Sequence, residues 1–424
     1  MKTDLAMHPD HHDTLESRDP PQREADLMRA LAAQVAHAQR HAGAFADLLA
    51  GVDAAQVDSR AALARLPVTR KHELQARQRA SLAAGGDVFG GFSAVGYGPA
   101  MRRVFCSPGP IFEPEGASGD HFRMARALFA AGLRRGELVH NSFSYHFTPA
   151  GLMMEAGALA IGCTVFPAGV GQTEQQVQAI AELRPAAYAG TPSFLKLILD
   201  KAADLGVALP SLRKASVGAE AFPAALRDWF TERGVQAYQS YGTADLGLIA
   251  YETEAREGLV LDEHVIVEIV RPGTGDPLPE GEVGEVVVTT LNPDYPLIRF
   301  GTGDLSAVLP GACPTGRTNT RIKGWLGRAD QTAKVRGMFV HPGQVAEVVK
   351  RCAEVGRARL VVSGEMADDR MLLMVEVAGT PDGLAERLAS QLREVTKLRG
   401  EVQLCAPGSL PNDGRVIEDR RRIG

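Results

Sequence analysis

The feature that most constrains the fold is an alternation of short apolar runs with amphipathic stretches between residues 138 and 238. The intervening stretches have helical spacing, as at 174–183 and 192–205. A strand followed by a helix and a second strand predicts parallel pairing, so this order predicts a doubly wound parallel sheet. The apolar runs have the length of strands and cover residues 138–143, 163–167, 186–190, 214–217 and 235–238.

Other segments have different patterns, and 424 residues exceed the size of one typical core. Residues 25–80 have helical spacing, whereas residues 1–24 are polar and are expected to form a disordered leader. Short β-runs separated by turns indicate a small antiparallel β-subdomain over about 259–325. Strand and helix patterns after residue 359 indicate a small α+β domain. We therefore expect an α/β protein with a large N-terminal domain and a small C-terminal domain.

Composition limits the function classes. The net charge of −5 gives no electrostatic reason to expect nucleic acid or an anionic membrane as partner. No apolar run reaches 18 residues, so no transmembrane helix is expected. The five cysteines stand far apart without CxxC spacing, which is typical of reduced thiols in a cytoplasmic protein.

One short stretch, 240–245, concentrates residues suited to a nucleotide. Tyr241 offers a stacking face, Gly242 permits close backbone approach, and Asp245 is able to hold a hydrated Mg²⁺. Alone this stretch is more typical of an ordinary turn than of a ligand site. It stands in order with three further motifs, GAE at 218–220, RFGTGD at 299–304 and GRAD at 327–330.

This ordered set resembles the adenylate-forming enzymes, the acyl-CoA synthetase and luciferase superfamily, and most closely its phenylacetate-CoA ligase branch. The resemblance runs from about Arg102 to the C-terminus. It implies an enzyme that uses ATP, Mg²⁺ and CoA on a small-molecule carboxylic acid, in particular an aryl or arylacetic acid. Some relatives carry a zinc-binding cysteine cluster, but 251–268 contains no cysteine, so no zinc is expected. The branch also suggests a homodimer.

The resemblance assigns nucleotide-binding roles. Tyr241 would stack on adenine, Asp304 would accept both ribose hydroxyls, and Asp245 would replace the usual Mg²⁺-binding glutamate. Glu220 is open to two readings, because it would line the adenine face or cap the helix that follows Pro223. The remaining residues assigned to the nucleotide are Ser107, Gly109, Gly218, Ala219, Gly242, Thr243 and Arg328.

The loop expected to wrap the ATP phosphates, residues 106–116, departs from the family pattern. It keeps Ser107, Gly109 and Gly116 but has three prolines, two glutamates and no lysine. Proline removes backbone donors and glutamate repels phosphate, so this loop is expected to hold phosphates weakly or to act otherwise.

The C-terminal part supplies the hinge and the second departure. Asp330 is expected to be the pivot between a domain of residues 1–329 and a mobile lid of residues 330–424. Gly337 would let the pantetheine arm of CoA approach. In the family a lysine follows the glycine of the tail, whereas here Arg415 follows Gly414. Arginine keeps the charge, so Arg415 is the candidate catalytic residue beside Asp245 and Arg328.

The acyl pocket is expected to be bordered by Tyr145, His146 and Phe147, although Phe147 also fits the start of a buried helix. Three functions remain open. The first is an AMP-forming acid–CoA ligase. The second is a related adenylyl or acyl transferase with another acceptor. The third is a catalytically impaired homologue that binds a nucleotide or an aromatic acid, which the altered loop and tail would favour.

Overall fold

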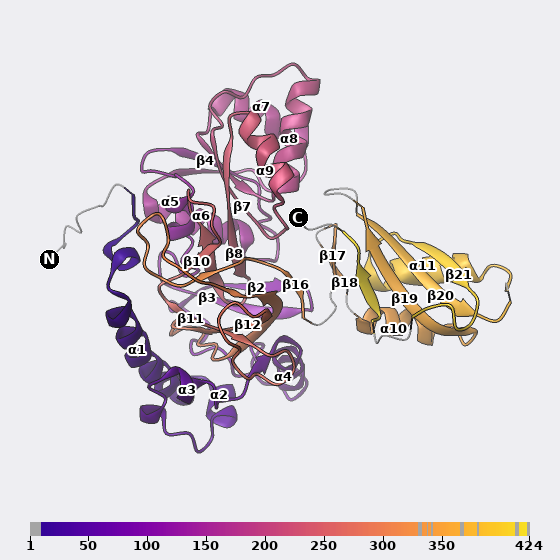
Figure 1. Ribbon diagram of the computed structural model, residues 1–424, viewed down its shortest axis with the longest axis horizontal. Helices are drawn as coiled ribbons and strands as arrows, with labels where there is room; N and C mark the ends of the chain where they lie inside the picture. The colour runs from indigo at the N-terminus through magenta and orange to yellow at the C-terminus, as the bar shows by residue number, and fades with distance from the viewer. Residues whose placement is uncertain are drawn as a thin grey trace. The chain divides into compact units, whose positions relative to one another are not determined.

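The computed structural model describes residues 10–329, 333–336, 338–340, 342–364, 369–379, 381–411 and 415–421. The chain divides into two compact units, Met1–Gly327 and Arg328–Gly424 (Figure 1). The expected hinge residue, Asp330, lies outside the described residues, so the boundary at 329–330 stays a prediction.

A nine-stranded sheet is the centre of the first unit, and five of its strands confirm the predicted parallel region. Strands β8, β7, β6, β4 and β5 are parallel neighbours, while the pairs from β8 to β14 are antiparallel. In sheet order the strands are β14 (Val308–Leu309), β15 (Arg321–Ile322), β10 (Leu259–Leu261), β9 (Gly247–Glu252), β8 (Gln236–Thr243), β7 (Lys214–Gly218), β6 (Ala187–Gly190), β4 (Leu138–Asn141) and β5 (Thr164–Pro167).

Local sequence explains where the crossover helices begin and end. Thr191 caps α8 by accepting from the Phe194 N–H, and Pro192 occupies the first turn, where its missing N–H is harmless. Gly162 ends α6 with a left-handed φ of 93°. The helices of this region are α5 (Ala125–Ala130), α6 (Ala150–Ile161), α7 (Thr173–Leu183), α8 (Pro192–Asp204) and α9 (Ala224–Glu232).

The segment predicted as one β-subdomain contributes to two sheets. β10, β14 and β15 extend the nine-stranded sheet, so the subdomain is not a separate body. The other strands form a second sheet, in which β1 pairs parallel with β13 and the remaining pairs are antiparallel. Its strands are β1 (Thr69–Arg70), β13 (Phe300–Ser306), β12 (Gly284–Thr290) and β11 (Val265–Val270). Every residue of β11 and β12 is buried, including Glu268 and Glu285.

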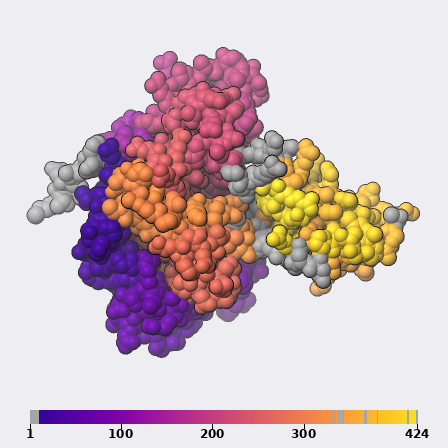
Figure 2. Space-filling model, in the orientation of Figure 1, coloured from indigo at the N-terminus to yellow at the C-terminus, as the bar shows by residue number. Residues whose placement is uncertain are grey.

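The expectation of a disordered leader is wrong for residues 10–24. They form η1 (Thr14–Ser17) and the start of α1 (Pro20–His41), and the buried Glu16 pairs with Arg126 and Arg317. Glu16, whose charge suggested a disordered leader, is thus neutralised inside the fold. Figure 2 shows the N-terminal helices, in indigo and purple, along one side of this unit. They continue with α2 (Gly43–Leu48), η2 (Ala54–Gln56), α3 (Arg60–Leu63) and α4 (Lys71–Ala83).

The residues expected to form the phosphate loop instead form an antiparallel hairpin of β2 (Met101–Ser107) and β3 (Ile111–Gly116). Pro108, Gly109 and Pro110 make the turn. Prolines are tolerated at a hairpin tip because their missing donors are not needed in the ladder.

The second unit is the predicted small α+β domain, with its own apolar core. One sheet has the order β21, β20, β19, β22, in which β19 and β20 are antiparallel and the outer pairs are parallel. β16 (Gly327–Arg328) spans the division between the two units. The elements of the second unit are β17 (Ala333–Val335), β18 (Met338–Val340), α10 (Pro342–Lys350), β19 (Val355–Ser363), β20 (Arg370–Val377), α11 (Leu384–Thr396), β21 (Glu401–Cys405) and β22 (Ile417–Asp419). In the described part of the chain, no helix has the length and apolar character needed to cross a bilayer.

Candidate functional site

The stretch 240–245 is the end of β8 and its turn into β9, rather than a loop after a short strand. β8 continues to Thr243, five residues beyond the predicted end, because β9 pairs antiparallel with it. A Cβ on Gly242 would lie 2.5 Å from the Gly247 carbonyl oxygen, so only glycine fits there. The Thr243 hydroxyl accepts from the Leu246 N–H at 3.1 Å and closes the turn.

The register of β7 against β8 places the motif at 218–220 beside the motif at 240–245. Gly218, the last residue of β7, pairs with Ser240 of β8, and a Cβ on Gly218 would lie 3.1 Å from the Ser240 carbonyl oxygen. Ala219 follows with a left-handed φ of 66°. Glu220 accepts a hydrogen bond from the Ser193 hydroxyl at 2.6 Å, and no side chain caps α9, so the capping role is not observed. Motifs 218–220 and 240–245 thus share one sheet edge, the carboxyl ends of parallel strands where ligands bind in such folds.

Asp304 of β13 joins Tyr241 to a residue that the sequence did not single out. The Tyr241 hydroxyl donates to Asp304 Oδ2 at 2.9 Å, and the Trp325 indole N–H donates to Asp304 Oδ1 at 2.9 Å. Asp304 is 8% exposed. One donor on each carboxylate oxygen fixes the orientation of the group.

Asp245 is buried in the β8–β9 turn and pairs with Lys71. The Lys71 ammonium, at the start of α4, lies 2.8 Å from Asp245 Oδ2. Oδ1 of Asp245 is buried and has no hydrogen-bond partner among the described residues. Sequence analysis missed Lys71, because no local pattern links it to a turn 174 positions away.

The two glutamates of the hairpin are buried. Glu113 is fully buried and accepts from both the N–H and the hydroxyl of Ser107. Burial, and then the Asp245 charge, raise the pKa of Glu113 to about 8, against the opposing effects of Ser107 and Lys71. Glu115 is also buried, and both its oxygens accept from Arg103 at 2.9 Å.

Helix α4 holds this hairpin in place. The buried Gln78 side chain donates to the Phe112 carbonyl at 2.8 Å and accepts from the Phe112 N–H at 2.9 Å. At the tip, Arg79 donates to the carbonyl of Gly109 at 3.1 Å. At the other end of β3, the buried His121 accepts from the Gly116 N–H at 3.1 Å, and burial lowers its pKa to about 4.

The expected pocket wall consists of one half-buried side chain, Tyr145, and two exposed ones. The Tyr145 hydroxyl donates to Glu155 at 2.9 Å and accepts from Asn141 at 2.8 Å. His146 is exposed and Phe147 is 81% exposed, so Phe147 does not start a buried helix. The backbone of Phe147 accepts from the Cys106 N–H at 2.8 Å, which ties this segment to the hairpin.

The remaining predicted residues belong to the second unit or lie outside the description. Arg328 and Arg415 are described and are part of the second unit. Asp330 and Gly337 lie outside the described residues. The motifs of the first unit are therefore assembled, whereas the structure does not test the hinge.

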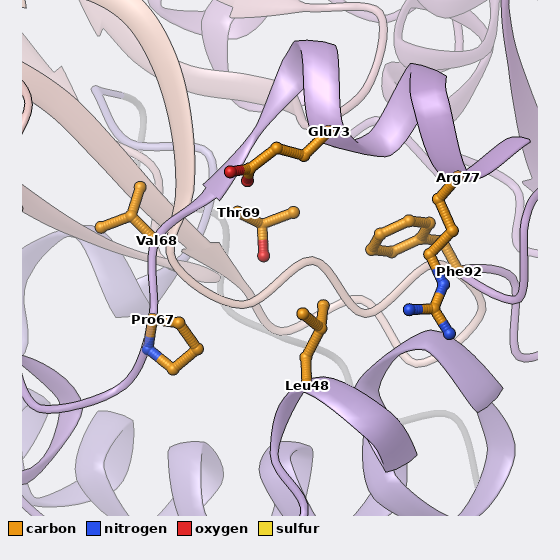
Figure 3. Close-up of a pocket in the computed structure, with 7 residues that line it drawn as sticks. All are labelled: Leu48, Pro67, Val68, Thr69, Glu73, Arg77 and Phe92. Atoms are coloured by element: carbon orange, nitrogen blue, oxygen red, sulfur yellow. The ribbon is translucent and has the colours of Figure 1, made fainter.

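A cavity of about 350 Å³ lies elsewhere in the first unit, beside α4 (Figure 3). Glu73 and Arg77 reach it from α4 and Leu48 from α2, and none of the predicted site residues lines it. Among the described residues, no group of three or more His, Cys, Asp or Glu side chains is placed to hold a metal ion.

Comparison with known proteins agrees with this geometry. A family model described as AMP-binding enzyme matches residues 121–292. Phenylacetate-coenzyme A ligase of Thermus thermophilus is 35% identical over 317 residues, which cover 68% of this chain and 71% of that protein. Phenylacetate-coenzyme A ligase of Escherichia coli (strain K12) is 36% identical over 323 residues, which cover 71% and 73%.

Solved structures share the fold. A 2-hydroxyisobutyryl-CoA ligase in complex with 2-HIB-AMP and CoA superposes with a TM-score of 0.82 at 24% identity, covering 97% of this chain and 92% of that one. Amide bond synthetase McbA from Marinactinospora thermotolerans has a TM-score of 0.56 at 20% identity, covering 75% and 68%. The fold and the assembled motifs define an adenylate-forming enzyme. Within that superfamily, the chain belongs to the phenylacetate-CoA ligase family.

Proposed function

We propose that this protein is an AMP-forming acid–CoA ligase. A carboxylate oxygen of the acid attacks the α-phosphorus of ATP, and pyrophosphate leaves. The sulfur of CoA then attacks the carbonyl carbon of the acyl-AMP, and AMP leaves. The observation that carries this proposal is the fixed Asp304 carboxylate beside Tyr241, at the sheet edge where motifs 218–220 and 240–245 meet.

The nucleotide would bind along this edge. Asp304 would accept the ribose hydroxyls, because a carboxylate offers two acceptor oxygens and its orientation is set by Tyr241 and Trp325. Tyr241 would stack on adenine with its ring held by the hydroxyl bond to Asp304. The adenine and phosphates would meet the backbone and side chains of Ser107, Gly109, Gly218, Ala219, Glu220, Gly242 and Thr243.

Asp245 suits the role of Mg²⁺ ligand that the family resemblance gives it. Its buried Oδ1 is an acceptor without a hydrogen-bond partner among the described residues. When bound, Mg²⁺ neutralises negative charge on the phosphates. Asp245 would keep the bound ion in place relative to the nucleotide, because the β8–β9 turn fixes the Asp245 backbone.

The second unit would supply the remaining groups. Arg328 would contact the ribose or a phosphate, and Arg415 would bridge the substrate carboxylate and the α-phosphate by charge. Asp330 would be the pivot between residues 1–329 and a lid of residues 330–424, and Gly337 would admit the pantetheine arm. A pivot is needed because adenylation and thiolation require different groups at the same carbonyl.

The acid we propose is an aryl or arylacetic acid, bound near Tyr145, His146 and Phe147. The two phenylacetate-coenzyme A ligases described above support this class. The Tyr145–Glu155 and Tyr145–Asn141 hydrogen bonds would fix the tyrosine ring at the acyl end of the site.

The test is pyrophosphate release with ATP, Mg²⁺ and a panel of aromatic and short aliphatic acids, without and with CoA. We expect release that depends on an arylacetic acid and rises with CoA. Release that is indifferent to CoA would favour transfer to another acceptor. No release from any acid, together with calorimetric binding of ATP or AMP, would favour a nucleotide-binding homologue.

We also propose a cytoplasmic homodimer. The five cysteines are free, which fits a reducing compartment. Size-exclusion chromatography with light scattering would measure twice the chain mass of 45.2 kDa for a dimer, and a mass of 45.2 kDa would contradict it.

A further inference from the structure

The hydrogen-bond donors of Ser107 are engaged inside the hairpin β2–β3. The Ser107 N–H donates to Glu113 Oε2 at 3.2 Å, and its hydroxyl donates to Glu113 Oε1. Both residues are buried, and Glu113 has no exposed surface. A phosphate is held by several N–H and O–H donors that point at it together. Ser107 is therefore committed to a carboxyl group of its own hairpin before a nucleotide arrives.

The turn of the hairpin adds a single backbone donor. Pro108 and Pro110 have no N–H, so Gly109 is the residue of the turn that keeps one. The carbonyl oxygens of the turn accept from helix α4, since Arg79 donates to Gly109 at 3.1 Å and Gln75 donates to Pro110 at 3.3 Å. The turn is thus held against α4.

The N–H groups beside the turn are engaged as well. Cys106 donates to the Phe147 carbonyl at 2.8 Å, and Phe112 donates to the buried Gln78 side chain at 2.9 Å. Opening the hairpin into a loop would break these bonds, each of which contributes about 0.5–1.5 kcal/mol. Residues 106–116 also contain no lysine. We therefore expect the hairpin to stay closed and to offer few donors to a chain of phosphates.

The adenosine end of the site is formed outside the hairpin. Asp304 is oriented by Tyr241 and Trp325. Gly218 and Gly242 belong to β7 and β8, at the sheet edge where the two motifs meet. The site thus has a preorganised end for adenosine, and an end poor in donors where the β- and γ-phosphates would lie.

We propose that this site recognises a nucleoside monophosphate, so that it binds AMP and acyl-AMP through the adenosine end and binds ATP no more tightly than AMP. This inference rests on the proposed nucleotide site, and it leaves Gly109 as the donor of the hairpin turn. The hairpin is not needed to hold an acyl-AMP, so the chain is also able to start from an acyl-AMP that a separate ATP-dependent adenylation supplies. The CoA sulfur then bonds to the carbonyl carbon, the bond from that carbon to the AMP oxygen breaks, and the thiol proton passes to solvent.

Isothermal titration calorimetry of the full chain, with Mg²⁺ and without acid or CoA, would compare AMP with ATP. We expect the dissociation constant for ATP to lie within about threefold of that for AMP or to be weaker. ATP that binds more than about threefold tighter than AMP would overturn this inference and leave the proposed function intact.

Pro108→Lys tests whether the hairpin causes this selectivity. Pro108 is exposed, and the change gives the turn an N–H and an ammonium. ATP should bind about fivefold tighter or better, because charge-assisted hydrogen bonds are the strong ones, while AMP affinity stays the same. Pro210→Lys adds the same charge at an exposed position after α8 and should change neither affinity. Unchanged ATP affinity in a folded Pro108→Lys variant, checked by circular dichroism, would overturn the assignment to the hairpin.

A second assay supplies phenylacetyl-AMP and CoA to the full chain and measures the acyl-CoA, after subtracting the rate without protein. This route should be about tenfold faster or better than phenylacetate with ATP and CoA at the same concentrations, because it needs no contact with the β- and γ-phosphates. An equal or slower rate would overturn the use of a supplied acyl-AMP. Acyl-CoA from phenylacetyl-AMP, with no pyrophosphate release from any acid, would uphold this inference while the proposed function fails.

Discussion

At the scale of single residues, the nucleotide site depends on the Asp304 carboxylate. Its two oxygens accept from Tyr241 and Trp325, so its orientation is set before any ligand arrives. Sequence analysis identified Asp304 and Tyr241 because they stand in recognisable glycine-rich motifs. It missed Trp325, Lys71 and the burial of Glu113, because these depend on contacts between distant segments.

Replacing Asp304 by asparagine should weaken ATP binding by about 1.5–3 kcal/mol, since a hydrogen bond to a charged acceptor is worth that much. The amide also has one acceptor oxygen in place of two. Isothermal titration calorimetry with ATP would measure the change. Asp200→Asn is a suitable control, because Asp200 is a carboxylate of α8 that pairs with Lys196 and should not affect affinity. Unchanged affinity in Asp304→Asn would contradict the ribose role.

Trp325→Phe keeps an aromatic ring and removes the indole N–H donor. We expect nucleotide affinity to fall by about 1 kcal/mol, the usual value of one hydrogen bond. The preference for ATP over 2′,3′-dideoxy-ATP should also narrow, because Asp304 loses one of the donors that orient it. The other tryptophan supplies the control, since Trp229 stacks against Arg233 and Trp229→Phe should retain the preference. An unchanged preference in Trp325→Phe would show that the donor is dispensable.

At the scale of elements, the hairpin β2–β3 is the largest difference between expectation and structure. Glycines and prolines at 108–116 indicated a loop, yet Glu113 and Glu115 alternate with other residues as in a strand. The pattern was hidden because buried positions of this strand are carboxylates, of which Glu113 is hydrogen-bonded to Ser107 and Glu115 is paired with Arg103. Sequence periodicity detects apolar burial and does not detect paired charges.

Gln78→Ala should release the hairpin from α4. It removes both hydrogen bonds to Phe112, and we expect a loss of about 1–3 kcal/mol in the free energy of unfolding. Hydrogen exchange should quicken at residues 101–116 more than elsewhere. Gln75→Ala is the control, because Gln75 makes one longer bond of 3.3 Å to Pro110. Equal protection of the hairpin in both variants would argue against anchoring by Gln78.

His121 should make stability depend on pH. Its folded-state pKa of about 4 lies below the ordinary value of 6.5, so the unfolded chain binds a proton that the folded chain excludes. Stability is therefore expected to fall as the pH drops from 6.5 to about 4. Urea unfolding between pH 4.5 and 7.5 would measure this slope, which should be shallower in His121→Asn. Identical slopes would mean that other groups cause the dependence.

At the scale of the whole molecule, the strand–helix alternation predicted the parallel sheet, and five strands confirm it. Residues 10–24 were predicted wrongly as disordered, since charges that suggest disorder in a sequence form buried pairs such as Glu16 with Arg317. The second unit was predicted as a small α+β domain because its strands and α11 are strongly patterned. The hinge at Asp330 and the role of Arg415 stay predictions.

The most direct test of the account is acid-dependent exchange of labelled pyrophosphate into ATP, measured without CoA. Exchange requires reversible formation of an acyl-AMP, and it isolates the half-reaction in which the altered hairpin and Arg415 take part. The account predicts exchange with an arylacetic acid and Mg²⁺, and its loss in Asp304→Asn. Nucleotide binding without exchange, for every acid of the panel, would contradict the account.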